Sequence, residues 1–314
     1  MKIFILKKFF AATIMLAALC VSCSDDDGPK NPAEALSITI KADGSTSTGA
    51  KFTPASNDSF FLDYVLYQIV DSHIEVIGYD KSEIKGDIKV YSPINYFGVT
   101  YNVRSIADGA FSRCGTITSV NLPDCINYIG EQAFNECSNL KSINLPSELP
   151  YISRQCFDDC KKLNDVILPQ GIEFIGGGAF GDCANIGKVI LPEGITTIGG
   201  YAFSGCGNLG DLNIPSSCKE IGGGAFEGCS FTNLTIENGV EYVCYEAFAN
   251  CKIKNVILPS SLIYRDYPGF SYADTEYVFQ NSDIDIVRAS LSHWSENERK
   301  YFFMNASIKE LIIN

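Results

Sequence analysis

The stretch GGGAFGDC, residues 176–183, combines residue types that could bind phosphate, react as a thiol or hold a metal. Glycine-rich loops present backbone N–H groups to phosphate, and a cysteine can be a nucleophile or a ligand. A similar stretch, GGGAFEGC, occupies residues 222–229. Neither has the lysine and Ser/Thr of a phosphate-binding loop, and no helix signal follows. We therefore expect no phosphate site, and the two stretches need another explanation.

Other residues with catalytic or metal-binding potential are scattered. Cys156 and Cys160, in CFDDC, are the best candidates for metal ligands, but no second pair and no histidine completes a site. His73 and His293 lie far apart, and no Ser/His/Asp spacing or nucleophile elbow occurs. A glycosidase-type pair of carboxylates stays open, for example within 266–276. We predict no enzymatic activity, no cofactor and no metal.

The glycine-rich stretches belong to a repeat. The pattern A-F-x-x-C recurs as AFSRC, AFNEC, CFDDC, AFGDC, AFSGC, AFEGC and AFANC, with five spacings of 23 residues and one of 22. The cysteines of this ladder are Cys114, Cys137, Cys160, Cys183, Cys206, Cys229 and Cys251. Self-similarity at such a period predicts stacked structural units, so each GGGAF is the same corner of a different coil.

The elements that position these corners can be read within one repeat. An alternating I-x-L segment predicts a short strand with one face buried, and a proline such as Pro169 or Pro192 ends it. A second apolar pair leads to glycine, which we expect to permit a tight turn into the corner. These glycines are Gly130, Gly176, Gly199 and Gly222. A 23-residue coil cannot bury its own apolar side, so the coils must stack into a right-handed solenoid with parallel strands.

This pattern resembles the BspA-like, or Treponema-type, leucine-rich repeat family. The resemblance covers roughly 103–258 and continues weakly through YVFQNS and YFFMNASIKELIIN, where Ser282 and Ala306 replace the ladder cysteine. It implies a leucine-rich-repeat solenoid with parallel strands on the concave face, and short strands and helical turns on the convex side. By the same resemblance, the protein is expected to act in adhesion, to host extracellular matrix proteins or to other bacterial surface proteins.

The first residues predict export and lipid anchoring. Lys2, Lys7 and Lys8 precede an apolar run, 9–21, that is too short to span a membrane. The following LCVSC resembles a bacterial lipobox, which makes Cys23 the lipid-bearing residue; Cys20 stands where leucine is usual. A cleaved signal with a free Cys23 is the alternative. The acids after it, Asp25, Asp26 and Asp27, resemble the export tag of Bacteroidetes-type surface lipoproteins, although they also suit a solvated tether.

Five segments follow from these patterns. We predict a lipoprotein signal peptide at 1–22, a flexible acidic tether at 23–36, an N-terminal β cap at 37–102, regular 23-residue repeats at 103–258, and irregular repeats with an insertion and a C-terminal cap at 259–314. The net charge of −13 argues against nucleic acid and anionic membrane surfaces as partners. Membrane contact is therefore expected through the N-terminal lipid only, at the outer membrane and exposed on the cell surface.

Most of the 13 cysteines have a structural explanation. Apart from Cys20 and Cys23, they take positions where the repeat has a small or apolar residue, which a free cysteine can replace. Stacked coils would bring equivalent thiols within bonding range, so disulfides remain an alternative. A ladder of equivalent thiols has no preferred partner, however, and we predict buried, unpaired cysteines.

The candidate partner-binding surface is the outward side of the strands. Its residues are Asp165, Ile167, Lys188, Ile190, Asp211 and Asn213. The repeat register places Ile167 beside Ile190 with Asn144 and Asn213 flanking them, whereas the alternating charges could simply pair across strands. A second candidate is the insertion, with Tyr264, Tyr267, Phe270, Tyr272 and Tyr277, which could instead pack over the end of the solenoid.

These patterns favour a non-catalytic cell-surface lipoprotein whose solenoid binds a protein partner. One alternative is a carbohydrate-binding accessory lipoprotein of a nutrient-uptake system, which predicts aromatic platforms, and the outward strand positions contain none. Another is a structural envelope protein that self-associates weakly through the open edge of the strand in SIKELIIN.

Overall fold

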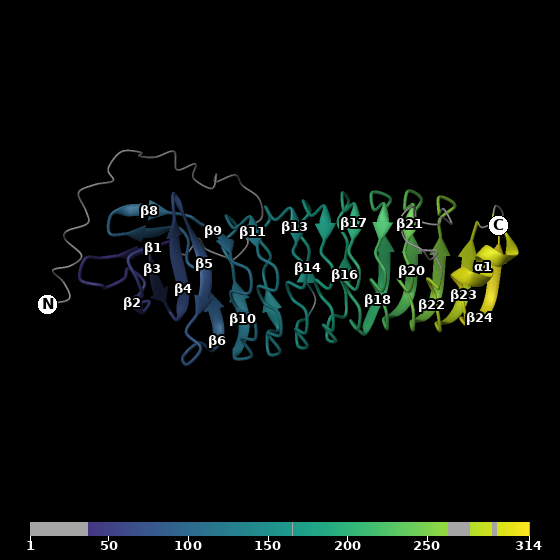
Figure 1. Cartoon of the computed structure of the whole chain (residues 1–314), viewed down its shortest axis with the longest axis horizontal. Coiled ribbons are helices and arrows are strands. Elements are labelled where there is room, and N and C mark those ends of the chain that lie inside the picture. Colours follow the sequence, from purple (N-terminus) through teal and green to yellow (C-terminus); the bar gives the residue numbers. More distant parts are fainter. Residues whose placement is uncertain (1–36, 165, 263–276, 291–293, 314) are drawn as a thin grey trace. The chain divides into compact units, whose positions relative to one another are not determined.

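The structure is a computed structural model that describes residues 37–164, 166–262, 277–290 and 294–313. These residues form 24 β-strands and one short α-helix (Figure 1). From residue 103 onward the chain runs in coils, and the strands of these coils lie in two separate rows. The strand in the L-x-x-I-x-L segment is called the leucine strand below, and the strand before the A-F-x-x-C corner is called the isoleucine strand.

The leucine strands pair in parallel from one coil to the next. They are β10 (Ile117–Asn121), β12 (Ser142–Ile143), β14 (Val166–Ile167), β16 (Val189–Ile190), β18 (Asn208–Ile214), β20 (Ser230–Ile236), β22 (Lys252–Leu258), β23 (Asp283–Ala289) and β24 (Ser307–Ile313). They form the sheets β12-β10-β6, β14-β16 and β18-β20-β22-β23-β24. Side chains alternate along each strand, so that in β18 Leu209, Leu212 and Ile214 are buried while Asp211 is exposed.

The isoleucine strands form the second parallel row. They are β9 (Val103–Ile106), β11 (Tyr128–Ile129), β13 (Tyr151–Ile152), β15 (Phe174–Ile175), β17 (Thr197–Ile198), β19 (Glu220–Ile221) and β21 (Tyr242–Val243). In β15 to β19 each second residue, such as Ile175, is buried and pairs in register with its equivalent one coil away. The two rows therefore enclose a core between them.

Eight N-terminal strands of the described chain precede the coils. They are β1 (Ile38–Ile40), β2 (Phe52–Pro54), β3 (Ser59–Leu62), β4 (Val65–Val70), β5 (His73–Tyr79), β6 (Gly86–Lys89), β7 (Ile94–Tyr96) and β8 (Val99–Tyr101). The antiparallel strands β2 to β5 extend the isoleucine row through β9, and β6 pairs with the first leucine strand, β10. Because the first coil is paired in both rows, its core side is covered by residues of the predicted cap.

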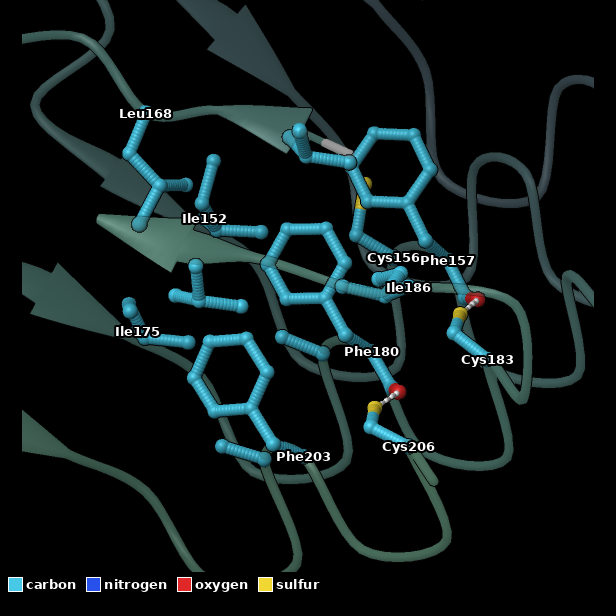
Figure 2. Packing of buried hydrophobic residues seen from close by; sticks show 14 of the residues in the cluster. Ile152, Cys156, Phe157, Leu168, Ile175, Phe180, Cys183, Ile186, Phe203 and Cys206 are labelled. Carbon is cyan, nitrogen blue, oxygen red and sulfur yellow. Dashed lines mark hydrogen bonds between the residues drawn. The ribbon is translucent and has the colours of Figure 1, made fainter. Parts of the chain in front are cut away.

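The core contains a continuous stack of phenylalanine rings. Phe157, Phe180 and Phe203 follow one another with ring centroids 5.3 Å apart and nearly parallel planes (Figure 2). The stack runs from Tyr79 on Phe111 to Phe248 on Phe279. Centroids this far apart with parallel planes mean that the rings are offset, which is the favourable arrangement for aromatic pairs.

The A-F-x-x-C corners are successive turns, and the helical turns that we expected on this side are not found in the described corners. In the corner at 176–183, Ala179, Gly181 and Cys183 donate their N–H groups to carbonyls three residues earlier. The alternate N–H groups, for example of Phe180, donate instead to the next coil (Phe180 N to Ala202 O, 2.8 Å). A helix uses the N–H groups of its interior for its own i→i−4 bonds, whereas here alternate N–H groups join neighbouring coils.

The corner glycine does not have the role that the sequence predicted. Gly176 has no positive φ; the left-handed residues of this corner are Gly178 (65°) and Asp182 (53°). A Cβ atom on Gly176 would lie only 2.6 Å from the backbone nitrogen of Arg154 in the preceding coil. Gly199 has the same relation to Gly177, again at 2.6 Å. These glycines therefore allow the close approach of stacked backbones and do not serve the turn.

The repeats continue to the last described residues. Helix α1 (Glu296–Phe302) begins with a capping box in which Ser295 and Glu298 exchange side-chain-to-backbone hydrogen bonds. Phe302 at its end is buried against Trp294. Strand β24 pairs with β23, but Leu311 and Ile313 are exposed, while their partners Val287 and Ala289 are buried. No helix within the described ranges is long and apolar enough to cross a membrane.

Candidate functional site

Two isoleucines stand out from the leucine strands. Ile167 is 85% exposed and Ile190 is 59% exposed, and the two residues are register partners on β14 and β16. Their neighbours Val166 and Val189 are buried and hold both strands to the core. The predicted placement of the two isoleucines side by side on the outer face is thereby confirmed. Directly opposite residues on paired strands have Cβ atoms about 5 Å apart, so they offer one continuous apolar contact.

The amides that flank this pair are already engaged. Asn144 makes two hydrogen bonds to the backbone of Leu122: its Oδ1 accepts from the Leu122 N–H (2.8 Å), and its Nδ2 donates to the Leu122 carbonyl oxygen (2.7 Å). Asn213 donates to a carboxylate oxygen of Glu237 (2.7 Å). Both side chains therefore serve the stacking of the coils. Ile167 and Ile190 have no such role, because apolar side chains form no hydrogen bonds. Their exposure to water also contributes no favourable free energy.

The charged residues beside the isoleucines are held in part by hydrogen bonds from asparagine side chains. Asp211 accepts a hydrogen bond from the side chain of Asn233 (2.7 Å), which in turn accepts one from Asn255 (3.0 Å). Lys188 is exposed. Asp165, the remaining charged candidate, lies outside the described residues, so the predicted alternation of charge at 165 and 188 has no structural test. The amide ladder stabilises the exposed face of β18, β20 and β22.

The cysteines of the ladder are hydrogen-bond donors in the core. The Sγ of Cys183 donates to the carbonyl of Phe157 in the preceding coil (3.0 Å), and Cys206 donates likewise to Phe180 (Figure 2). The same bond is made by Cys137, Cys160, Cys229 and Cys251. Ser282 takes this position in a later coil and donates to Phe248 (2.7 Å). The prediction of a buried residue is confirmed, but its role as a donor was missed; the serine at position 282 was the signal.

Burial makes these thiols poor nucleophiles. It raises the pKa of Cys229 to about 12 and the pKa of Cys183 well above the ordinary value, because a thiolate there would lose its hydration. Among the described residues no cysteine forms a disulfide. Cys156 and Cys160 are both fully buried, and Cys160 is bonded to the carbonyl of Phe134. In the described part of the chain no group of His, Cys, Asp and Glu side chains has metal-binding geometry.

A polar groove of about 740 Å³ lies between β4, β5 and the first corners, and the sequence had not indicated it. Its lining includes Tyr79, Arg113, Glu136 and Asp158. Arg113 and Glu136 form an ion pair (3.2 Å), and burial together with neighbouring carboxylates raises the pKa of Asp158. The charges of the groove are thus largely balanced among themselves, and its lining suggests no particular ligand.

Several predicted residues lie outside the described ranges. They are Cys23, Asp25, Asp26, Asp27, Asp165, Tyr264, Tyr267, Phe270 and Tyr272. Tyr277 is described and lies in a corner, where its backbone N–H donates to Tyr301.

The chain is similar to known proteins in both sequence and fold. The model of the family described as BspA type leucine rich repeat region matches residues 90–210 and 196–314, with six copies. A leucine-rich repeat protein from Bacteroides ovatus is similar in structure, with a TM-score of 0.56 and 24% identity over 81% of this chain and 76% of its own. No curated protein matches the chain.

Two other solved structures are less similar to this chain in fold. The leucine-rich repeat protein of T. pallidum has a TM-score of 0.39 and 23% identity over 66% of this chain and 86% of its own. A leucine rich cell surface protein from Faecalibacterium prausnitzii has a TM-score of 0.40 and 17% identity over 83% of this chain and 96% of its own. The Bacteroides ovatus protein is the one among the three whose similarity supports a common fold.

Proposed function

The chain belongs to the BspA-type leucine-rich repeat family, and from this premise we propose that it is a non-catalytic surface lipoprotein that binds a protein partner through the outer face of its leucine strands. The partner would be a host extracellular matrix protein or a bacterial surface protein, so that the function is adhesion. Solenoids offer extended faces for such binding.

The observation that carries this proposal is the exposed pair Ile167 and Ile190. Fully burying one such side chain contributes about 1.5–3 kcal/mol, so the pair could supply a large part of a moderate affinity. The amide ladder beside it could contribute hydrogen bonds at the rim, as polar residues do in many interfaces.

Binding of the purified protein to a panel of matrix proteins and glycans tests this proposal. We expect the double variant Ile167→Asp with Ile190→Asp to abolish partner binding while its thermal unfolding stays unchanged. Ile257→Asp is the matched control, because Ile257 is also exposed on a leucine strand, three coils from Ile190. Unchanged binding by the folded double variant, or equal loss in the control, would contradict the proposal.

Anchoring is a separate part of the proposal. It rests on the lipobox-like LCVSC, with Cys23 acylated, and on Asp25, Asp26 and Asp27 as the tag for the outer surface of the outer membrane. We expect Cys23→Ala to move the protein from the membrane fraction to the soluble fraction. Protease added to intact cells should digest the wild-type protein. If Cys23→Ala stays in the membrane, the lipid anchor is wrong, and if intact cells protect the protein, it faces the periplasm.

A carbohydrate-binding role has one observation in its favour. The first residues of three successive isoleucine strands are Tyr128, Tyr151 and Phe174, of which Tyr151 and Phe174 are exposed register partners. Tyr128 and Tyr151 contact edge to face, with centroids 6.5 Å apart. Aromatic rings in such a row can stack on sugar rings. Tyr151→Ala should then remove glycan binding but leave protein binding intact, and the opposite result would remove this alternative.

A further inference from the structure

Two exposed tyrosines occupy corner positions where the neighbouring coils have glycine. Tyr201 is 45% exposed and has a positive φ of 58°, and its equivalents in the coils before and after are Gly178 and Gly224. Tyr245 is 43% exposed and takes the position that Gly223 has one coil earlier. Large aromatic side chains at these positions are not needed for the corner, since the other coils form it with glycine or with polar and charged residues such as Gln155 and Arg154.

Glycines of the coil between them make room for both rings. A Cβ atom on Gly223 would lie 2.7 Å from Cε1 and 2.8 Å from Cζ of Tyr245. On Gly224 it would collide with the same edge of Tyr201, 2.6 Å from Cδ1. The two rings therefore approach one glycine backbone from the coil on either side, and nearly half of each side chain faces solvent. Such rings form a supported platform and not two freely moving side chains.

The platform is surrounded by negative charge. Burial is the main cause that raises the pKa of Tyr201, followed by the Tyr245 phenol, and the carboxylates of Glu246 and Glu227 act in the same direction. Glu227 is held in place by Asn250, which donates to its Oε1 (3.0 Å). The three corners involved, 199–205, 222–228 and 244–250, contain no lysine or arginine.

A cation is the group that fits this chemistry. The face of a tyrosine ring attracts a cation through its quadrupole, and nearby carboxylates add direct charge attraction. A guanidinium group can stack on an aromatic ring and at the same time hydrogen-bond to a carboxylate, which suits two rings with acids beside them.

We propose that Tyr201 and Tyr245, with Glu227 and Glu246, bind an arginine side chain of a protein partner. This corner platform belongs to a different part of the coil from the strand face with Ile167 and Ile190, so it is a second contact surface. It is independent of the proposed function at the strand face. A partner that presents exposed arginines matches it by charge, in keeping with the net charge of −13 of the whole chain.

The test uses the peptide acetyl-Gly-Arg-Gly-amide as the probe, titrated with the purified protein and followed through the NMR signals of the peptide's own side chain, which are present for every protein variant. Its analogue with neutral citrulline in place of arginine reports the contribution of charge. We expect Tyr201→Asn with Tyr245→Ala to raise the Kd of the arginine peptide about fivefold. Asparagine is chosen because it tolerates the left-handed backbone that Tyr201 adopts.

Matched variants separate the platform from the general negative charge of the chain. Glu227→Gln with Glu246→Gln should raise the Kd about threefold. Tyr151→Ala, on an isoleucine strand, and Glu173→Gln, directly before one, should leave the Kd unchanged. Gly223→Ala should also weaken binding, because it displaces the Tyr245 ring without removing a ring or a charge. Ile167→Asp with Ile190→Asp should have no effect on this peptide.

Three results would overturn the proposal. The first is that the arginine peptide binds the folded tyrosine variant as tightly as it binds the wild type. The second is that the Tyr151 and Glu173 controls lose as much affinity as the platform variants. The third is that the citrulline peptide binds as tightly as the arginine peptide. Should the tyrosine variant fail to fold, the same comparison between Gly223→Ala and wild type decides the question.

Discussion

The corners at 176–183 and 222–229 have almost the same sequence, GGGAFGDC and GGGAFEGC, but different surroundings. In both, the first glycine touches the backbone of the preceding coil, and the cysteine donates to a phenylalanine carbonyl. The second and third glycines differ. Those at 223 and 224 lie under the rings of Tyr245 and Tyr201, whereas a Cβ on Gly177 would meet only the carbonyl of Gly200, at 3.3 Å.

This difference separates a shared architectural role from a local one. In these two corners, positions one and eight both contact backbone atoms of the preceding coil, and that backbone repeats. Positions two and three face side chains of adjacent coils, which vary. Two stretches that look identical can therefore differ in function when their neighbours differ.

Alkaline pH should test the shared role of Cys183 and Cys229 most strongly. Burial raises the pKa of the Cys229 thiol from 9.0 to about 12. Stability is then fully present below pH 9, where the unfolded thiol is also protonated, and is lost as pH rises from 9 towards 12, because only the unfolded chain ionises. Each such thiol adds a slope of up to about 1.4 kcal/mol per pH unit.

Urea unfolding of the reduced protein between pH 8 and 11 measures this slope. Cys229→Ser should make it shallower, since a serine does not titrate in this range, while the stability at pH 8 changes less. An unaltered slope in this variant would mean that Cys229 is not the buried, protonated donor that the corner requires.

Substituting the first glycine should damage both corners equally. Gly176→Ala places a Cβ 2.6 Å from Arg154 N, and Gly222→Ala places one 2.7 Å from the carbonyl carbon of Gly199. We expect each to lower the free energy of unfolding by about 2–3 kcal/mol, because backbone atoms of stacked coils cannot move aside cheaply. Chemical denaturation at pH 7 measures the loss.

Gly171→Ala is the control for these variants, since no atom lies within 4 Å of a Cβ at that position and its φ is not positive. A small effect of Gly176→Ala, close to that of Gly171→Ala, would contradict the close approach of the coils.

Removing the thiol donor should have a smaller effect. Cys183→Ala and Cys229→Ala each leave a phenylalanine carbonyl with one hydrogen bond fewer and a small cavity, at a cost of about 1 kcal/mol. Serine should be better tolerated than alanine, as Ser282 makes the equivalent bond. Denaturant midpoints at pH 7 give this ranking. If the alanine variants are as stable as the wild type in both corners, the thiol hydrogen bonds do not stabilise the coils.

The second glycine should separate the two corners with little change in stability. Gly177→Ala and Gly223→Ala should each change the free energy of unfolding by less than about 1 kcal/mol, because a carbonyl at 3.3 Å and an exposed ring can both adjust. Only Gly223→Ala should shift the ring signals of Tyr245 in NMR spectra. A shift of these signals in both variants, or in neither, would contradict the different surroundings of the two corners.

Much of the scaffold followed from the repeat. The period placed Ile167 beside Ile190, and it placed Ala179, Phe180 and Cys183 in the core, as observed. These predictions succeed because equivalent residues of stacked coils meet one another, so spacing alone identifies the partner. The role of Gly176 was predicted wrongly, since a glycine in a turn suggests a positive φ and its sequence contains no sign of a nearby backbone.

The candidate surfaces were predictable to a smaller extent. Alternation along the strands identified the outward isoleucines, but it could not show that Asn144 and Asn213 have internal partners. Tyr201 and Tyr245 were missed, although each replaces a glycine of neighbouring repeats. Their orientation depends on empty space above Gly223 and Gly224, which belong to another coil.

The sequence by itself determined the coil, its period and which side chains face inward, because these follow from apolar residues that recur at a fixed interval and must be buried. Only the tertiary structure decided what each corner contacts. It assigned the thiols to phenylalanine carbonyls, the first glycines to the preceding backbone, and the tyrosines to the glycines beside them. The physical reason is that these contacts join residues of different coils at distances of a few ångströms, and the spacing along one coil does not encode them.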